Sequence, residues 1–254
     1  MFQFSLEHYL RRIGFAGQAL PTLSCVRQMM HCQLLRIPFE NLDIQAGKIV
    51  SLNPDDIAEK ILYRQRGGYC FEVNGLFAMA LEALQVPYFY IAARPMTHHN
   101  LKKPKTHMAV VAQIDGEQWL CDCGFGGYGL REPICIGQLE TAVEQDGEQF
   151  MLSRLNEQEI VLKSNVQGGW EAQYAFDLAR HDWVDFEPAN YYNSTHHDSL
   201  FVRKLLVVLY TQNGRKILFG NTLKIMENGR QEKQQLTQQN RQELLLREFG
   251  LVEN

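Results

Sequence analysis

The stretch Arg66-Gly67-Gly68-Tyr69-Cys70 constrains what this chain can fold into more than any other. Its two glycines end one segment, and apolar residues at a helical spacing follow the cysteine: Val73, Leu76, Phe77, Ala80, Leu81 and Leu84. The spacing predicts a helix with a buried face that begins at Cys70 and closes near Gln85. Unpaired N–H groups and the positive end of the helix dipole favour an anion in the first turn. Because the thiolate is the reactive form of cysteine, this position indicates a nucleophile, although a single cysteine more often only fills the core.

The composition is that of a soluble globular protein. The 254 residues are 45% hydrophobic and 21% charged, with a formal net charge of -4, which favours one large domain or two to three subdomains. The negative charge argues against nucleic acid as a partner, and no apolar run is long enough to span a membrane. The N-terminus lacks the pattern of a signal peptide, so we expect a cytoplasmic protein whose six cysteines are free thiols.

The first third of the chain has helical patterns. Ser5 is placed to cap a helix that Gly14 stops, and Pro21-Thr22 opens a second helix. Asn53-Pro54 combines a capping residue with proline at the first helical position, which predicts a further helix that ends at Gly67-Gly68.

From Pro87 onward the pattern changes to strands. Runs at 88–93, 107–114 and 118–123, followed by shorter runs at 134–136, 148–154, 159–162 and 170–176, predict a barrel-like β region. Polar loops are expected at 95–105 and 185–190. The last part mixes strands at 202–210, 216–219 and 222–226 with a hairpin at Asn228-Gly229 and a glutamine-rich polar surface. A terminal helix is capped at Thr237 and stopped by Gly250.

The dipeptide Asp115-Gly116 predicts a tight hairpin. A two-residue turn there places Asp122 opposite Ala109. Since side chains two apart on a strand share a face, Asp122 and His107 become diagonal neighbours within reach of each other.

Cys70, His107 and Asp122 then have assignable catalytic roles. His107 takes the proton from Cys70 or forms an ion pair with its thiolate, and Asp122 orients the imidazole and favours its charged form. Taken singly, His107 is better interpreted as a core histidine and Asp122 as a solvated acid at a hairpin edge. Because His107 and Asp122 share a face and follow a cysteine whose anion is stabilised at a helix start, we favour the interpretation that the three residues act together.

Two other groups have weaker signals. Cys121 and Cys123 flank Asp122 but face the other side of the strand, and without a second pair of ligands they predict no metal site. The glycine-rich stretch 124–129 lacks the spacing of a phosphate loop. It is either a flexible turn or a loop that lets a ligand pass close to the backbone, with Phe125 as an aromatic wall.

Blocks along nearly the whole chain resemble one family, the arylamine N-acetyltransferases. The Arg-Gly-Gly-Tyr-Cys block with its spaced histidine and aspartate is the most specific in combination. The blocks are YLRRIG (9–14), IPFENL (37–42), RGGYCFE (66–72), TH (106–107), DCGFG (122–126), DFEPAN (185–190) and FGL (249–251).

The resemblance implies an α+β fold with a helical bundle (1–86), a β-barrel (87–190), an α/β lid (191–254) and a thiol-protease-like core. It implies ping-pong acetyl transfer from acetyl-CoA, through a cysteine thioester, to an arylamine, arylhydrazine or N-hydroxyarylamine. The matching catalytic residues are Cys70, His107 and Asp122, and no metal is implied.

Binding residues follow from the same resemblance. Gly124, Gly126 and Gly127 are candidates for contact with CoA, and Phe39 and Phe125 for the pocket of an aromatic acceptor. Phe39 is equally read as a core residue. Arg66 and Glu40 are expected to form an ion pair.

Three rival functions remain open from the residues alone. The same Cys–His–Asp set serves thiol proteases and transglutaminase-like hydrolases, a binding module needs Cys70 only for packing, and a metal-dependent enzyme would use the cysteines as ligands. The sequence does not indicate the oligomeric state or the physiological acceptor.

Overall fold

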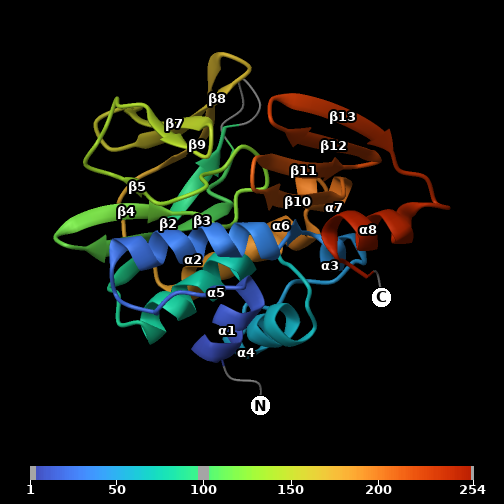
Figure 1. The fold of residues 1–254 in the computed structure, drawn as a ribbon, viewed down its shortest axis with the longest axis horizontal. Helices are drawn as coiled ribbons and strands as arrows, with labels where there is room; N and C mark the ends of the chain where they lie inside the picture. Colours follow the sequence, from blue (N-terminus) through green and yellow to red (C-terminus); the bar gives the residue numbers. More distant parts are fainter. Residues whose placement is uncertain (1–3, 97–102, 253–254) are drawn as a thin grey trace.

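The computed structural model describes residues 4–96 and 103–252, so part of the predicted loop 95–105 lies outside the described residues. Helices of the first third gather on one side of two β-sheets (Figure 1). They are α1 (Leu6–Ile13), α2 (Leu23–Arg36), α3 (Leu42–Gln45), α4 (Pro54–Ala58), the π-helical turn η1 (Glu59–Tyr63) and α5 (Cys70–Ala83).

Most ends of these helices confirm the sequence signals, but the helical stretch that begins at Pro54 ends at Tyr63 and not at Gly67-Gly68 as predicted. The Ser5 hydroxyl accepts the N–H of His8, and Gly14 ends α1 with φ 66°. Thr22 caps α2 in the same way, and Pro54 occupies the first turn of α4. Local capping chemistry therefore sets the frame in which α5 is held.

The central β region is one antiparallel sheet that curves into a nearly closed barrel (Figure 1). Its strand order is β5-β4-β3-β2-β9-β8-β7-β6. The strands are β2 (Tyr88–Pro95), β3 (His107–Ile114), β4 (Glu117–Cys121), β5 (Ile134–Cys135), β6 (Val143–Gln145), β7 (Glu148–Arg154), β8 (Ile160–Val166) and β9 (Gly169–Phe176). The barrel-like region predicted from the strand runs is confirmed.

The β3–β4 hairpin has the predicted register. Ile114 lies opposite Glu117, and Val110 lies opposite Cys121. Asp115 and Gly116 both have positive φ, 53° and 80°, as a two-residue turn of this hand requires. This register brings the start of β3 close to the residue that follows β4.

A second, five-stranded sheet pairs one strand from the first third of the chain with four strands from its last part. Its order is β1-β10-β11-β12-β13, and Phe39 in β1 lies opposite Val208 in β10. The strands are β1 (Phe39–Glu40), β10 (Leu206–Thr211), β11 (Gly214–Phe219), β12 (Thr222–Glu227) and β13 (Arg230–Gln235), with α7 (Leu200–Arg203) before them and α8 (Arg241–Phe249) after them. All side chains of β13 are exposed, which confirms the glutamine-rich stretch as a polar surface.

The expectation of a loop at 185–190 is wrong. The turn η2 (Trp183–Phe186) runs into α6 (Glu187–Thr195) there. Pro188 does not break this helix, because it lies in the first turn of α6, where the N–H that proline lacks would have no intrahelical acceptor. The terminal helix likewise begins at Arg241 rather than directly after Thr237, because Thr237 and Asn240 bond each other in a turn before it.

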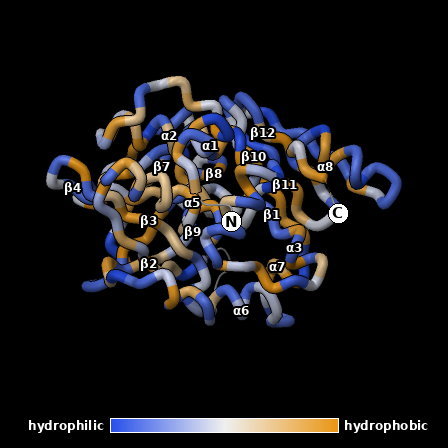
Figure 2. Tube along the Cα trace, turned by 90° about the horizontal axis from the view of Figure 1, so that it is seen from below, coloured by the Kyte–Doolittle hydropathy of each residue, from blue (hydrophilic) through white to orange (hydrophobic). Residues whose placement is uncertain are grey.

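Helix α5 lies in the interior, with the barrel strands β2 and β3 beside it and α1 and α4 on its other side. Leu76 and Phe77 are fully buried, and so is the polar residue Asn74. Figure 2 shows hydrophobic segments around β3 and hydrophilic ones along β12, at the outer part of the five-stranded sheet. The first turn of α5 is therefore fixed by the core itself.

Candidate active site

Cys70 is the first residue of α5, as predicted, and only 2% of it is exposed. The Glu72 carboxylate accepts a hydrogen bond from the N–H of Tyr69 at 3.0 Å. This bond caps the helix at the residue just before the cysteine. The Cys70 Sγ donates a long hydrogen bond of 3.9 Å to the carbonyl of Thr106, the residue before His107. The start of α5 and the start of β3 thus meet at the thiol.

His107 and Asp122 form the pair that the hairpin register predicted. His107 Nε2 lies 2.8 Å from Asp122 Oδ2, and both residues are buried. The other carboxylate oxygen, Oδ1, accepts hydrogen bonds from Asn74 Nδ2 at 3.0 Å and from the N–H of Gly124 at 2.9 Å. All three predicted catalytic residues lie in one place.

The charges of this pair support each other. Burial disfavours a charged imidazole, but the Asp122 carboxylate and, to a smaller extent, Cys70 outweigh it and raise the pKa of His107 to about 10. Burial also disfavours the carboxylate, but His107, Asn74 and Gly124 together hold the pKa of Asp122 below its ordinary value. An imidazolium at neutral pH is the form that stabilises a neighbouring thiolate.

The glycine loop, residues 124–129, packs closely against the helix that carries Cys70. A Cβ on Gly124 would lie 2.8 Å from Cys70 Cα, and a Cβ on Gly126 would lie 2.8 Å from Phe39 Cε1. A Cβ on Gly127 would meet only the Phe125 ring, at 3.3 Å. Gly124 and Gly126 therefore have a packing reason to be glycine, whereas Gly127 borders more open space.

Aromatic rings surround His107. The Phe125 ring lies 5.3 Å from the imidazole and the Tyr174 ring 5.0 Å from it, with 5.1 Å between the two aromatic rings. Phe125 is partly exposed, whereas Phe39 is 5% exposed and its ring centroid lies 5.9 Å from that of Phe201, with the two rings tilted by 45°. Phe125 is thus the candidate acceptor-binding residue that touches the reacting region, and Phe39 lies in the core behind the loop.

A cluster of largely buried ion pairs lies next to the start of α5 and includes Glu72 from its first turn. Lys60 Nζ lies 2.8 Å from the Glu72 carboxylate, 2.7 Å from Asp43 and 3.9 Å from Glu40. Arg66 Nη2 lies 2.7 Å from Glu40, which confirms the expected pair. Burial disfavours the Lys60 charge, but the three carboxylates outweigh it and raise the pKa of Lys60.

Within the described ranges, the side chains that suit a metal gather at one place only, His196, His197 and Asp198 at the surface. His196 Nδ1 already accepts the N–H of Asp198 at 3.1 Å, so its lone pair there is taken. Cys121 and Cys123 do not belong to such a group, and all six cysteines are free.

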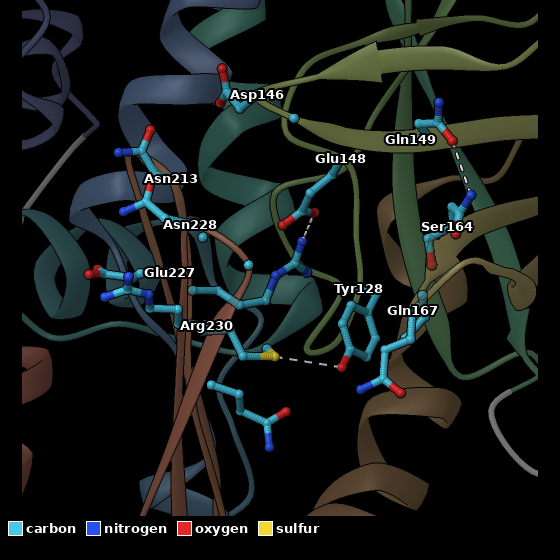
Figure 3. Close-up of a pocket in the computed structure, with 18 residues that line it drawn as sticks. Tyr128, Asp146, Glu148, Gln149, Ser164, Gln167, Asn213, Glu227, Asn228 and Arg230 are labelled. Carbon is cyan, nitrogen blue, oxygen red and sulfur yellow. Dashed lines mark hydrogen bonds and ion pairs between the residues drawn. The ribbon is translucent and has the colours of Figure 1, made fainter.

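A cleft of about 610 Å³ lies elsewhere, between the turns of the barrel and those of the five-stranded sheet (Figure 3). Cys70, His107 and Asp122 do not line it. Tyr128 and Arg215 do, and Arg215 Nη1 donates to the carbonyl of Gly127 at 2.6 Å while its Nη2 binds Glu148. The cleft therefore borders the outer side of the glycine loop, whose inner side faces His107.

Sequence reasoning missed the buried polar residues that hold these groups. Asn74 follows Cys70 by one helical turn, so helical spacing was an available signal for it. Tyr174 on β9 and Asn193 on α6 reach the site only through the tertiary fold, and no local pattern marks them.

None of the helices in the described part of the chain has the length and apolar character needed to cross a membrane. A sequence profile described as N-acetyltransferase matches residues 22–253. The arylamine N-acetyltransferase of Mycobacterium tuberculosis is 34% identical over 236 residues, which covers 90% of this chain and 82% of that protein. The arylamine N-acetyltransferase / N-hydroxyarylamine O-acetyltransferase of Salmonella typhimurium is 30% identical over 85% of this chain and 76% of its own length.

Solved structures agree over almost the whole chain. The arylamine N-acetyltransferase from Salmonella typhimurium superimposes with a TM-score of 0.92 at 28% identity, covering 98% of this chain and 92% of that one. The Mycobacterium marinum enzyme in complex with CoA gives a TM-score of 0.91 at 30% identity, over 97% and 92%. The match to these proteins over almost the whole chain defines this protein as an acyltransferase. The chain belongs to the arylamine N-acetyltransferase family.

Proposed function

We propose that this protein transfers acetyl groups from acetyl-CoA to arylamines, arylhydrazines or N-hydroxyarylamines by a ping-pong mechanism with Cys70 as the acetyl carrier. The observation that carries the proposal is the buried His107–Asp122 pair of 2.8 Å next to a cysteine at a helix start. The CoA complex of the Mycobacterium marinum relative supports CoA as the donor's carrier.

In the first half-reaction the Cys70 thiolate attacks the thioester carbonyl of acetyl-CoA. A new thioester forms on Cys70, the bond to the CoA sulfur breaks, and the His107 imidazolium gives its proton to the departing CoA thiolate. The N–H groups of Glu72 and Val73 donate to the Tyr69 carbonyl, so those of Cys70 and Phe71 at the start of α5 are the natural donors to the oxyanion.

In the second half-reaction the amine attacks the acetyl-Cys70 carbonyl. His107, now neutral, takes the proton from the amine nitrogen, and the Cys70 thiolate leaves, which restores the starting ion pair. Asp122 keeps the imidazole oriented through both halves and stabilises its charged form whenever it carries the proton. Its own position is fixed by Asn74 and the N–H of Gly124.

The glycine loop and Phe125 are proposed to receive the substrates. Cys70 and His107 are nearly buried, whereas residues 125–128 are partly exposed, so reactants approach past this loop. Gly127 has the most space around it and is the best candidate to border the pantetheine arm, with Gly124 and Gly126 shaping the loop. The Phe125 ring offers a flat acceptor an aromatic wall beside His107, and Phe39 supports it from the core.

The division into a helical bundle (1–86), a barrel (87–190) and an α/β lid (191–254) over a thiol-protease-like core is also proposed. The separate five-stranded sheet supports the lid, although β1 of the first region pairs with it. A cytoplasmic location is part of the same proposal and rests on the composition and the six free thiols.

Steady-state kinetics test this function. Double-reciprocal plots for acetyl-CoA against an aminobenzoate at several fixed acceptor concentrations should give parallel lines. Intersecting lines would contradict the ping-pong order, and Cys70→Ser should abolish transfer while leaving the fold intact.

A further inference from the structure

Helix α6 directs two buried asparagines at the region of the nucleophile. Asn190 accepts a hydrogen bond from the Tyr69 hydroxyl and donates to the Val50 carbonyl at 2.8 Å. Asn193, one turn later and 3% exposed, donates from Nδ2 to the Thr106 carbonyl at 2.9 Å. The Asn190 bonds hold the helix in place, whereas the Asn193 bond reaches a backbone group that touches Cys70.

The Thr106 carbonyl is shared by two donors. The Asn193 amide lies at 2.9 Å and the Cys70 Sγ at 3.9 Å, and the same residue directly precedes His107 in the chain. One backbone oxygen therefore connects the thiol, the strand that carries the imidazole, and an uncharged side chain from a helix far along the chain.

This oxygen competes with His107 for the thiol proton. A hydrogen bond from S–H to a carbonyl stabilises the neutral thiol, because a thiolate has no proton to donate and faces the negative end of the C=O dipole. An amide N–H on the same oxygen offsets that negative end and fixes the direction of the carbonyl.

We propose that Asn193 is a positioning residue for acetyl transfer: by donating to the Thr106 carbonyl, it favours release of the Cys70 proton to His107 and fixes the backbone before the imidazole. This inference rests on the proposed role of Cys70 as the acetyl carrier. Asn193 acts through Thr106 and needs no contact with substrate.

The other titratable groups around the thiol stay the same when Asn193 is changed. His107 with Asp122 faces it from the barrel side, and Tyr69 and Glu72 lie on its own helix side, with Glu72 paired to Lys60 at 2.8 Å. Leucine keeps the branched shape of asparagine, carries no charge and cannot donate a hydrogen bond. A change in thiol reactivity in Asn193→Leu therefore reports the lost hydrogen bond rather than a new charge.

The test follows carboxamidomethylation of Cys70 by iodoacetamide between pH 5 and 10, with the adduct located by peptide mass mapping. In Asn193→Leu, alkylation at neutral pH should slow by about 3- to 10-fold, the size of one hydrogen bond, and its midpoint should move to higher pH. Acetylation of Cys70 by acetyl-CoA should slow by a similar factor.

A matched control is Asn41→Leu. Asn41 is another buried asparagine that donates to two carbonyls, those of Phe201 at 2.7 Å and Lys204 at 2.9 Å. Its loss should lower the melting temperature without moving the alkylation profile. If Asn193→Leu does not fold, Asn193→Ala gives the same comparison.

Superimposable alkylation profiles of wild type and a folded Asn193 variant would overturn the role of Asn193 and leave the proposed function standing. Wild-type Cys70 that is alkylated but never acetylated would overturn the proposed function instead, since alkylation does not depend on acetyl-CoA.

Discussion

Asn74 Nδ2 lies 3.0 Å from Asp122 Oδ1, on the carboxylate oxygen that His107 does not use. The same amide group also donates to the Met108 carbonyl at 2.7 Å, and Asn74 Oδ1 accepts the N–H of Cys123 at 2.7 Å. One buried side chain on α5 thus ties together both strands of the hairpin that carries His107 and precedes Asp122.

Asn74→Ala should therefore impair both folding stability and Cys70 reactivity. It removes three buried hydrogen bonds, one of them to a carboxylate. Since each contributes about 0.5–3 kcal/mol, the free energy of unfolding should fall by ~3 kcal/mol in urea titrations. Alkylation of Cys70 at pH 7 should slow as well, because Asp122 loses one of the groups that fix its position.

The control for Asn74 is Asn41→Ala. Asn41 likewise makes three hydrogen bonds, to the carbonyls of Phe201 and Lys204 and from the N–H of Leu206, but they lie away from the thiol. It should lose comparable stability and keep wild-type alkylation. Equal alkylation in the two variants would show that Asn74 has only a packing role.

Asp122→Asn should convert His107 from a charged to a neutral ring at pH 7. The Asp122 carboxylate raises the pKa of His107 to about 10 against the effect of burial, so without that charge burial prevails and the pKa falls. Cys70 alkylation at pH 6–7 should slow on the order of 10²-fold or more, since the thiolate loses its cationic partner.

The raised pKa of His107 also determines how the free energy of unfolding depends on pH. His107 has a raised pKa in the folded state, so its contribution is complete below about pH 6.5, the ordinary value, and is lost as the pH rises through about 10. The Asp122 pKa is lowered, so its contribution is present above about pH 4 and is lost on acidification. The difference in unfolding free energy between wild type and Asp122→Asn should thus be largest between about pH 4 and 6.5; a difference that grows above pH 8 would contradict this account.

Gly124 and Gly127 of the glycine loop should respond differently to an added methyl group. In Gly124→Ala the new Cβ meets the Cys70 backbone at 2.8 Å, and such overpacking costs about 1–3 kcal/mol and displaces the nucleophile. In Gly127→Ala it meets only the Phe125 ring at 3.3 Å, so stability should change by less than ~0.5 kcal/mol.

Kinetics of the Gly127→Ala variant test its proposed contact with CoA. If the pantetheine arm passes this residue, KM for acetyl-CoA should rise several-fold while thermal stability stays unchanged. An unchanged KM would place the donor elsewhere along the loop.

Lys60→Met should lower the free energy of unfolding strongly, because it removes the largely buried cation of the ion cluster. It leaves Glu40 and Glu72, whose side chains are 0% and 2% exposed, without their shared cation, and breaking a buried pair costs about 3–5 kcal/mol. Lys48→Met is the matched control: Lys48 lies 3.6 Å from Asp43 of the same cluster but is 65% exposed, so its loss should cost under ~0.5 kcal/mol. Equal losses in chemical denaturation would argue against a structural role for the cluster.

The parts of this fold that the sequence predicted are those with local causes. Caps at Ser5 and Thr22 and stops at Gly14 and Gly250 act within one helical turn, and Asp115-Gly116 fixes a hairpin register that carries His107 and Asp122 together. Once the register is known, the distance between those two residues follows from strand geometry.

The parts that were missed depend on partners far along the chain. Phe39 pairs with Val208 across a sheet that no local pattern predicts. Asn193 reaches Thr106 from α6, a helix whose first residues lie in the segment predicted to be a loop. Proline at 188 has opposite meanings inside a helix and in its first turn, and only the tertiary position decides between them.

The most direct test of the central claim is the intact mass of the protein after incubation with acetyl-CoA and no acceptor, with the adduct mapped to a residue. The account predicts one acetyl group on Cys70, which an added aminobenzoate or arylhydrazine removes as the acetylated acceptor forms. A Cys70 that stays unmodified, under conditions in which iodoacetamide labels it, would contradict the proposal that this thiol carries the acetyl group.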